Sequence, residues 1–184
     1  MDIKLGTLEI FPVLERKDLL AEQVRRALEI FRNAEGIGVT EIDPMLSDTA
    51  AFCEHYQIGL EQAANCVVLE AMRGERTWYA ACVILASTRA DVNGIARKTL
   101  DARKVSFAPM EKAVEMTRME YGAITPIGLP ADWNILIDKA VVESPYVIIG
   151  SGIRKSKLAV PGKFLASLPN AQVIDGLGKV KAIN

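Results

Sequence analysis

The sequence carries almost no net charge and contains no long apolar run. Its 22 lysines and arginines are balanced by 23 aspartates and glutamates, which gives a formal charge of −1. Such a balance disfavours wholesale coating by nucleic acid, because non-specific binding to phosphates needs many uncompensated cations. No segment approaches the roughly 20 apolar residues that span a bilayer, and the first residues lack a signal-peptide pattern. We therefore expect a cytoplasmic protein without a membrane partner.

Histidine and cysteine are also scarce. His55 is the only histidine, and Cys53, Cys66 and Cys82 lack the paired spacing of a zinc site. Cys53 and His55 are two residues apart in a predicted helix and point to different faces, so we expect reduced, mostly buried thiols, no metal and no other cofactor. A Ser-His or Cys-His hydrolase would have to use His55, but no nucleophile elbow precedes a helix. We expect His55 at a surface or interface.

Periodic apolar residues predict helices and strands that alternate along the chain. An apolar stripe from Leu20 to Phe31 predicts a first helix over residues 18–33, capped by Asp18. The other predicted elements are, in chain order, a strand at 39–42, a helix from a cap at Ser47 or Asp48 to a break at Gly59, a hairpin of 66–69 and 77–85, a helix at 91–100, a strand at 105–107, a helix from Pro109 to 120, strands at 135–137, 146–149, 158–160 and 173–174, and a short helix at 163–168.

These elements predict a single α/β domain over residues 1–184. Because an all-parallel sheet would need a crossover of a dozen or more residues between strands, the short spacings and the hairpin favour a mixed, partly antiparallel and curved sheet flanked by helices. The first helix would form an N-terminal extension over residues 1–37, and its apolar surface is compatible with an oligomer. The tail, residues 176–184, is predicted to be flexible.

Two glycine loops are the most informative segments. The first runs from Gly122 to Pro130 (GAITPIGLP), and the second runs from Gly150 to Lys155 (GSGIRK). Glycine lets the backbone approach a ligand closely. The pair therefore predicts one pocket lined by main-chain N–H donors, which suit a carbonyl or a phosphate. Neither loop has P-loop or dinucleotide-binding spacing, and the alternative is that both only make turns between strands.

Basic residues lie close to the second loop. Arg154, Lys155 and Lys157 follow it directly, and a further basic cluster within residues 97–104 lies near the predicted third helix. Such side chains are suited to hold a phosphate backbone. The alternative is a solvated basic face, which charge runs usually form.

The order of four segments resembles the YbaK/EbsC/ProX family of aminoacyl-tRNA deacylases. The segments are Lys104–Ala108 (KVSFA), Gly122–Leu129, Ile135–Asp138 (ILID) and Gly150–Gly152. The family includes the editing domain of bacterial prolyl-tRNA synthetases and free-standing relatives, and the resemblance covers about residues 38–168. It implies the fold of these domains and hydrolysis of wrongly charged tRNA in trans. The implied partners are the aminoacylated acceptor end of a tRNA and an aminoacyl-tRNA synthetase.

The resemblance also implies roles for residues of both loops. Gly122–Gly128 would face the aminoacyl ester with backbone amides near its carbonyl, and Gly150–Gly152 would form the opposite wall. Asp138 would organise the loops or hold the substrate amino group; its alternative role is a cap at the strand end or a surface partner. The candidate residues are Asn65, Gly122 and Gly152 for catalysis, Ile124, Thr125, Pro126, Gly128, Asp138, Gly150 and Ser151 for substrate binding, and Arg154, Lys155 and Lys157 for tRNA binding.

One position departs from the family pattern. Active members carry a lysine in the strand that opens the hairpin, and the equivalent residue here is Asn65. Loss of a charge-assisted hydrogen bond of roughly 1.5–3 kcal/mol lowers binding or rate by about ten- to over a hundredfold. Asparagine can still donate and accept hydrogen bonds, so an altered activity is compatible with this change.

Three hypotheses about function remain open. The first is an editing enzyme in which main-chain donors stabilise the oxyanion, a ribose hydroxyl positions water, and pocket size selects the aminoacyl group. The second is a non-catalytic module that binds an aminoacyl group or a tRNA end and has lost turnover because Asn65 replaces the lysine. The third is an unrelated small-molecule hydrolase that uses His55.

Overall fold

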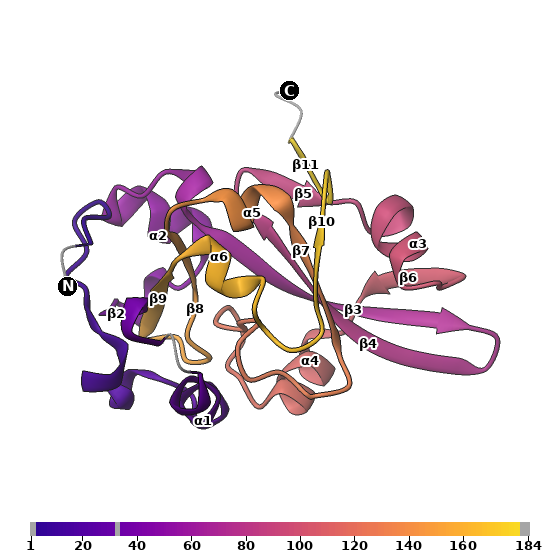
Figure 1. Ribbon diagram of the computed structural model, residues 1–184, viewed down its shortest axis with the longest axis horizontal. Helices are drawn as coiled ribbons and strands as arrows, with labels where there is room; N and C mark the ends of the chain where they lie inside the picture. Colours follow the sequence, from indigo (N-terminus) through magenta and orange to yellow (C-terminus); the bar gives the residue numbers. More distant parts are fainter. Residues whose placement is uncertain (1–2, 32–33, 181–184) are drawn as a thin grey trace.

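Three sheets form the frame of the protein (Figure 1). The computed structural model describes residues 3–31 and 34–180. The strand orders are β10-β7-β4-β3-β6, β1-β2-β9-β8 and β11-β5. Parallel and antiparallel pairs occur together and helices flank the sheets, which confirms the predicted mixed α/β class. The strands are β1 Phe11–Pro12, β2 Gly38–Glu41, β3 Ala64–Arg73, β4 Arg76–Leu85, β5 Thr88–Ala90, β6 Lys104–Phe107, β7 Asn134–Asp138, β8 Val147–Gly150, β9 Ser156–Val160, β10 Ala171–Ile174 and β11 Gly178–Val180; the helices are α1 Glu22–Ile30, α2 Thr49–Tyr56, α3 Arg97–Thr99, α4 Met110–Thr117, α5 Lys139–Glu143 and α6 Gly162–Leu165.

The longest strands, β3 and β4, form the predicted hairpin. They pair antiparallel over their full length, and the turn between them uses Gly74 at φ +60°. In Figure 1 the hairpin extends beyond the rest of the molecule. β7 joins β4 in parallel, and residues 80–84 of β4 are buried, as expected of a central strand. Ala64, the first residue of β3, is buried and the next three residues are half-buried, so this end of the strand can line a site that is open to solvent.

The main core lies between the two larger sheets and α1. It includes Val83 and Ile137 from the five-stranded sheet, Ile149 and Leu158 from the four-stranded sheet, and Val24 from α1. Full burial of one such side chain contributes about 1.5–3 kcal/mol. This packing fixes β8 and β9, the antiparallel pair that carries the second glycine loop.

The first helix is shorter than predicted and has a different N-terminus. Asp18 does not cap it; its carboxylate instead accepts a hydrogen bond of 3.1 Å from the Arg16 guanidinium. The helix begins at Glu22 because Leu20 and Ala21 adopt extended backbone conformations. The buried stripe on α1 is confirmed, whereas residues 32–33 of the predicted helix lie outside the described residues.

The cap of the second helix is confirmed. The Asp48 carboxylate accepts hydrogen bonds from the N–H groups of Ala50 at 3.0 Å and Ala51 at 3.4 Å, at the start of α2. The helix ends before Gly59 because Gln57 adopts a left-handed conformation with φ 56°. The cap fixes the N-terminus of α2 beside the start of β3.

Two other helices are also shorter than predicted. Residues 91–100 form a π-helical turn at Val92–Ala96 followed by the short α3. α4 begins at Met110, one residue after the predicted start at Pro109, and it ends at Thr117 because Arg118 is left-handed, with φ 54°. In the part of the chain that the structure describes, no helix is long and apolar enough to cross a membrane.

Part of the predicted flexible tail, residues 176–184, pairs with another strand. β11 pairs antiparallel with β5, a three-residue strand that the sequence analysis missed. Leu177 is fully buried, and its carbonyl accepts a hydrogen bond of 2.9 Å from the N–H of Asp91. Residues up to 180 are therefore held by the fold, and residues 181–184 lie outside the described residues.

Asp138 is part of this anchorage. It ends β7 and caps α5, where its Oδ1 accepts from the N–H of Ala140 at 2.8 Å. Its Oδ2 accepts from the N–H of Gly178 at the start of β11. Both oxygens are thus engaged in structural hydrogen bonds, as the alternative role of a cap at the strand end requires.

We predict that Asp138→Ala lowers the free energy of unfolding by about 1–3 kcal/mol, because it leaves the N–H groups of Ala140 and Gly178 without their acceptor. Urea unfolding measures the change. Asp132→Ala, which removes an exposed carboxylate, is the matched control and should change stability by less than about 0.5 kcal/mol. Equal effects of the two substitutions would contradict the anchoring role.

Candidate functional site

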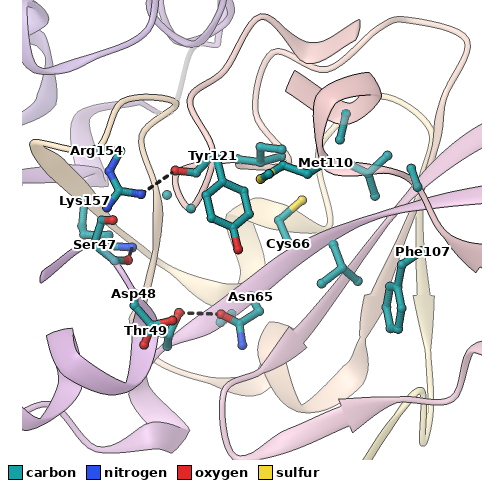
Figure 2. A pocket seen from close by; sticks show the side chains of 18 residues that line it. Ser47, Asp48, Thr49, Asn65, Cys66, Phe107, Met110, Tyr121, Arg154 and Lys157 are labelled. Carbon is teal, nitrogen blue, oxygen red and sulfur yellow. Dashed lines mark hydrogen bonds between the residues drawn. The ribbon is translucent and has the colours of Figure 1, made fainter. Parts of the chain in front are cut away.

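A cavity of about 460 Å³ opens between the start of β3, the N-terminus of α2, the first glycine loop and the end of β8 (Figure 2). Gly122 and Ile124 line it from the first loop, and Gly150 lines it at the start of the second. Asn65 lines it from the start of β3. The structure therefore brings the two loops to one pocket, as their sequences predict.

The two loops contact each other directly through their backbones. The N–H of Gly152 donates a hydrogen bond of 2.8 Å to the carbonyl of Ala123. A Cβ atom added to Gly150 would overlap that same carbonyl. Glycine at position 150 is therefore required by a neighbouring chain segment, independently of any ligand.

Two of the candidate glycines, Gly128 and Gly152, contact the start of α1 and its N-cap residue. A Cβ atom on Gly152 would overlap the side chain of Ala21, and one on Gly128 would lie 2.7 Å from the carbonyl oxygen of Gln23. Both glycines have positive φ, +86° and +82°. The side chain of Gln23 extends this contact by donating to the carbonyl of Thr117 at 2.7 Å. These glycines let α1 support the loops from the side opposite the pocket.

The side chains of Thr125 and Ser151 do not line the pocket. Thr125 is fully buried, as is Ser151, and Pro126 is buried beside Thr125. The Ser151 hydroxyl lies 2.7 Å from the Ser156 hydroxyl, which donates to the carbonyl of Leu19 at 2.6 Å. These contacts give Ser151 a structural role, and they hold the loop between β8 and β9 in shape.

Asn65 links β3 to α2 across the pocket. Its Oδ1 accepts a hydrogen bond of 2.7 Å from the hydroxyl of Thr49, shown dashed in Figure 2. Thr49 and its neighbour Asp48 also line the pocket. The short side chain of Asn65 thus places an amide, rather than a charge, at this wall.

The positive charges of the pocket come from Lys157 and Arg154. Lys157, on β9, is 6% exposed, lines the pocket, and donates from Nζ to the carbonyl of Ser47 at 2.9 Å. Its ammonium lies 5.5 Å from the centre of the Phe52 ring. Burial lowers the pKa of Lys157 to about 8. Lys157 is therefore an internal residue of the site, whereas Lys155 is exposed outside it.

Arg154 supplies a second cation at the same wall. Its guanidinium donates to the carbonyls of Tyr121 and Pro44, both at 3.0 Å. A Cβ atom on Gly122 would lie 3.1 Å from Arg154 Nη1 and 3.4 Å from the Ser47 hydroxyl. That hydroxyl is buried and has no hydrogen-bond partner among the described residues. The backbone of Gly122 and the side chains of Arg154 and Ser47 thus form one compact polar wall.

The pocket has a polar end and an apolar end. In Figure 2, Arg154, Lys157 and Asn65 lie on one side, and Phe107 lies on the other. Such a pocket suits a ligand that joins a polar or anionic group to a small apolar group. Lining residues that the sequence analysis did not single out include Ser47, Thr49, Val68, Phe107, Met110 and Tyr121.

The cysteine and histidine side chains do not offer a nucleophile or base. Cys66 lines the pocket, but burial raises the pKa of its thiol far above the ordinary value, so the reactive thiolate is suppressed. His55 is exposed on α2 and does not line the pocket. Within the described residues, no group of three histidine, cysteine, aspartate or glutamate side chains could hold a metal ion.

The family of aminoacyl-tRNA editing domains matches residues 43–168. The chain belongs to this family. The match contains both glycine loops, the start of β3, and β9 with Lys157. It leaves α1 and β11 outside, although α1 contacts the loops of the editing domain.

Solved structures share this fold. A candidate trans-editing enzyme for prolyl-tRNA synthetase is 21% identical, with a TM-score of 0.70, over 85% of this chain and 97% of that chain. The hypothetical protein APE2540 is 17% identical, with a TM-score of 0.72, over 86% of this chain and 100% of that chain. At such identities the likeness establishes the fold alone. The comparison with curated proteins gives no match.

We predict that Gly150→Ala destabilises this editing domain by about 2 kcal/mol or more, because the added methyl group overlaps the Ala123 carbonyl and separates the loops. The control is Gly36→Ala, where the nearest atom to a new Cβ lies at 3.6 Å. Urea unfolding of both variants checks the prediction. Equal midpoints for Gly150→Ala and the wild type would rule out the close backbone contact.

We predict that Lys157→Met stabilises the fold by about 1–2 kcal/mol at pH 7. The fall in the pKa of Lys157 from 10.5 to about 8 corresponds to a burial penalty of about 3 kcal/mol, and the lost hydrogen bond to Ser47 offsets part of the gain. Urea unfolding at pH 7 measures the difference.

The pH dependence supplies the control for this prediction. Between about pH 8 and 10.5 the unfolded wild type holds a proton that the folded protein has lost, so its stability rises with pH relative to Lys157→Met. The advantage of the variant should shrink across this window. A difference that stays constant from pH 7 to 10.5 would show that the Lys157 pKa is not depressed.

Proposed function

We propose that the chain hydrolyses wrongly charged aminoacyl-tRNA in trans, with the aminoacyl ester bound between Gly122, Gly150 and β3. The observation that carries this proposal is the cavity of about 460 Å³, framed by both glycine loops and two cations, in a member of the aminoacyl-tRNA editing family. The candidate trans-editing enzyme among the similar structures supports action on tRNA released by a synthetase. Charged tRNA is consumed in the cytoplasm, where we place this activity.

In this proposal, water attacks the ester carbonyl and the protein stabilises the tetrahedral oxyanion. The main chain at Gly122 approaches the carbonyl, and Arg154 and Lys157 stabilise the negative charge. The ribose hydroxyl next to the ester positions the water. The ester C–O bond breaks, the ribose oxygen takes a proton, and no acyl-protein intermediate forms.

Lys157 supplies the charge that the family resemblance places at position 65. It enters the same pocket from β9, while Asn65 on β3 is held by Thr49. The apolar end, with Val68, Ala113 and Ile124, receives the amino-acid side chain and limits its size. This makes the pocket a sieve that rejects larger, correctly attached residues.

The alternative is a module that binds the charged tRNA end without turnover. The hydrogen bond between Asn65 and Thr49 favours it, because it commits the Asn65 carbonyl oxygen to a structural contact. The two functions differ in one observable: an enzyme releases amino acid with multiple turnovers, whereas a binding module retains or protects the ester.

We predict multiple-turnover deacylation by the wild type in a panel of mischarged tRNAs that begins with alanyl- and cysteinyl-tRNA(Pro). Lys157→Met should lower kcat/KM about ten- to hundredfold, as expected for loss of a charge-assisted hydrogen bond of roughly 1.5–3 kcal/mol. Lys163→Met removes an exposed lysine on α6 and should leave the rate unchanged. Release of labelled amino acid is measured.

Asn65→Lys separates the two functions in the same assay. Turnover by the wild type establishes the enzyme and shows that a lysine at position 65 is dispensable. Turnover by the Asn65→Lys variant but not by the wild type identifies the wild-type protein as a binding module. Absence of turnover in both folded proteins overturns the deacylase proposal for the substrates in the panel.

A further inference from the structure

Three large apolar side chains are exposed where the pocket opens. Tyr121 and Phe107 are each 61% exposed and Met110 is 51% exposed, and all three line the pocket. Figure 2 shows the Tyr121 ring over the pocket beside Arg154, with Phe107 at the far side. Exposed side chains of this size gathered at one opening indicate a binding surface.

These three side chains are not part of the hydrophobic core. Val105, on the same strand as Phe107, is 3% exposed, and Ala113, one turn after Met110 on α4, is 5% exposed. Tyr121 contributes to the fold through its backbone carbonyl, which accepts from Arg154. Its ring can therefore be removed without removing that hydrogen bond.

The size and chemistry of this surface fit a nucleotide base better than a protein. A stable protein interface buries about 800 Å² on each partner, far more than three side chains present. A single base has one flat apolar face, and stacking on an aromatic ring contributes about 1–3 kcal/mol. The neighbouring guanidinium of Arg154 adds a positive charge at the edge of the surface.

The covalent structure of the substrate determines which base lies at the opening of the pocket. This step rests on the proposed function: an aminoacyl group in the pocket is esterified to the ribose of the last nucleotide. The base of that nucleotide must then lie within one sugar of the pocket, at its opening. Tyr121 and Phe107 are the aromatic side chains among the pocket's lining residues.

We propose that Tyr121 and Phe107, with Met110, form a stacking platform for the unpaired 3′-terminal bases of tRNA. Tyr121 takes the last base, because its ring lies over the pocket beside Arg154. The platform recognises the RNA end without regard to the attached amino acid, whereas the pocket selects the aminoacyl group.

The test uses an uncharged RNA hairpin that ends in unpaired CC followed by 2-aminopurine, whose fluorescence falls on stacking. The wild type should quench it saturably, and Tyr121→Phe should do the same. Tyr121→Ala and Phe107→Ala should weaken binding about five- to a hundredfold. Ile30→Ala removes an 81% exposed apolar side chain on α1 and should leave binding unchanged.

The same variants separate this inference from the proposed function. With a charged hairpin, Tyr121→Ala should raise KM and preserve kcat, because the reacting atoms lie in the pocket. Hydrolysis of the charged hairpin without quenching of 2-aminopurine fluorescence overturns the platform but supports the deacylase proposal. Quenching without hydrolysis supports the platform and overturns the deacylase. Normal quenching by both alanine variants, together with lost binding to a synthetase, assigns the surface to a protein and overturns the platform.

Discussion

The candidate site depends on one backbone contact, the 2.8 Å hydrogen bond from the N–H of Gly152 to the carbonyl of Ala123. It joins the loop after α4 to the turn between β8 and β9, and the lack of a side chain at Gly150 lets the two segments approach. Arg154 follows on the same turn and donates to the carbonyl of Tyr121. One contact between main chains therefore sets the pocket wall, the orientation of a cation and the place of an aromatic ring.

α1 packs against the loops of the site although the family match begins at residue 43. Gly128 and Gly152 contact its first turn, and Gln23 donates to the carbonyls of Thr117 and Arg118 at the end of α4. Loops are usually the least stable parts of a fold. A helix packed behind both loops keeps their backbone donors in place, which is what stabilisation of a developing charge requires.

The sequence predicts elements with strong local signals and misses those that tertiary contacts decide. The hairpin around Gly74 and the Asp48 cap follow from local pattern and turn chemistry. β5 and β11 are three residues each and exist because they pair with one another. The two loops contact each other, but which glycines face α1 depends on partners more than a hundred residues away in the chain. Lys157 directly precedes the predicted strand at 158–160, and its burial follows from the extension of that strand to Ser156 in the structure.

The burial of Lys157 is the strongest physical argument that this pocket receives a polar ligand. An ammonium removed from water is costly unless it is paired, and here its hydrogen-bond partner is a backbone carbonyl. An apolar side chain of similar length would pack against Phe52 without that cost. The Asp48 carboxylate and the Ser47 carbonyl offset part of that cost. The remaining cost is consistent with the proposed ligand, whose developing negative charge would lie near Lys157 and the main chain of the glycine loops.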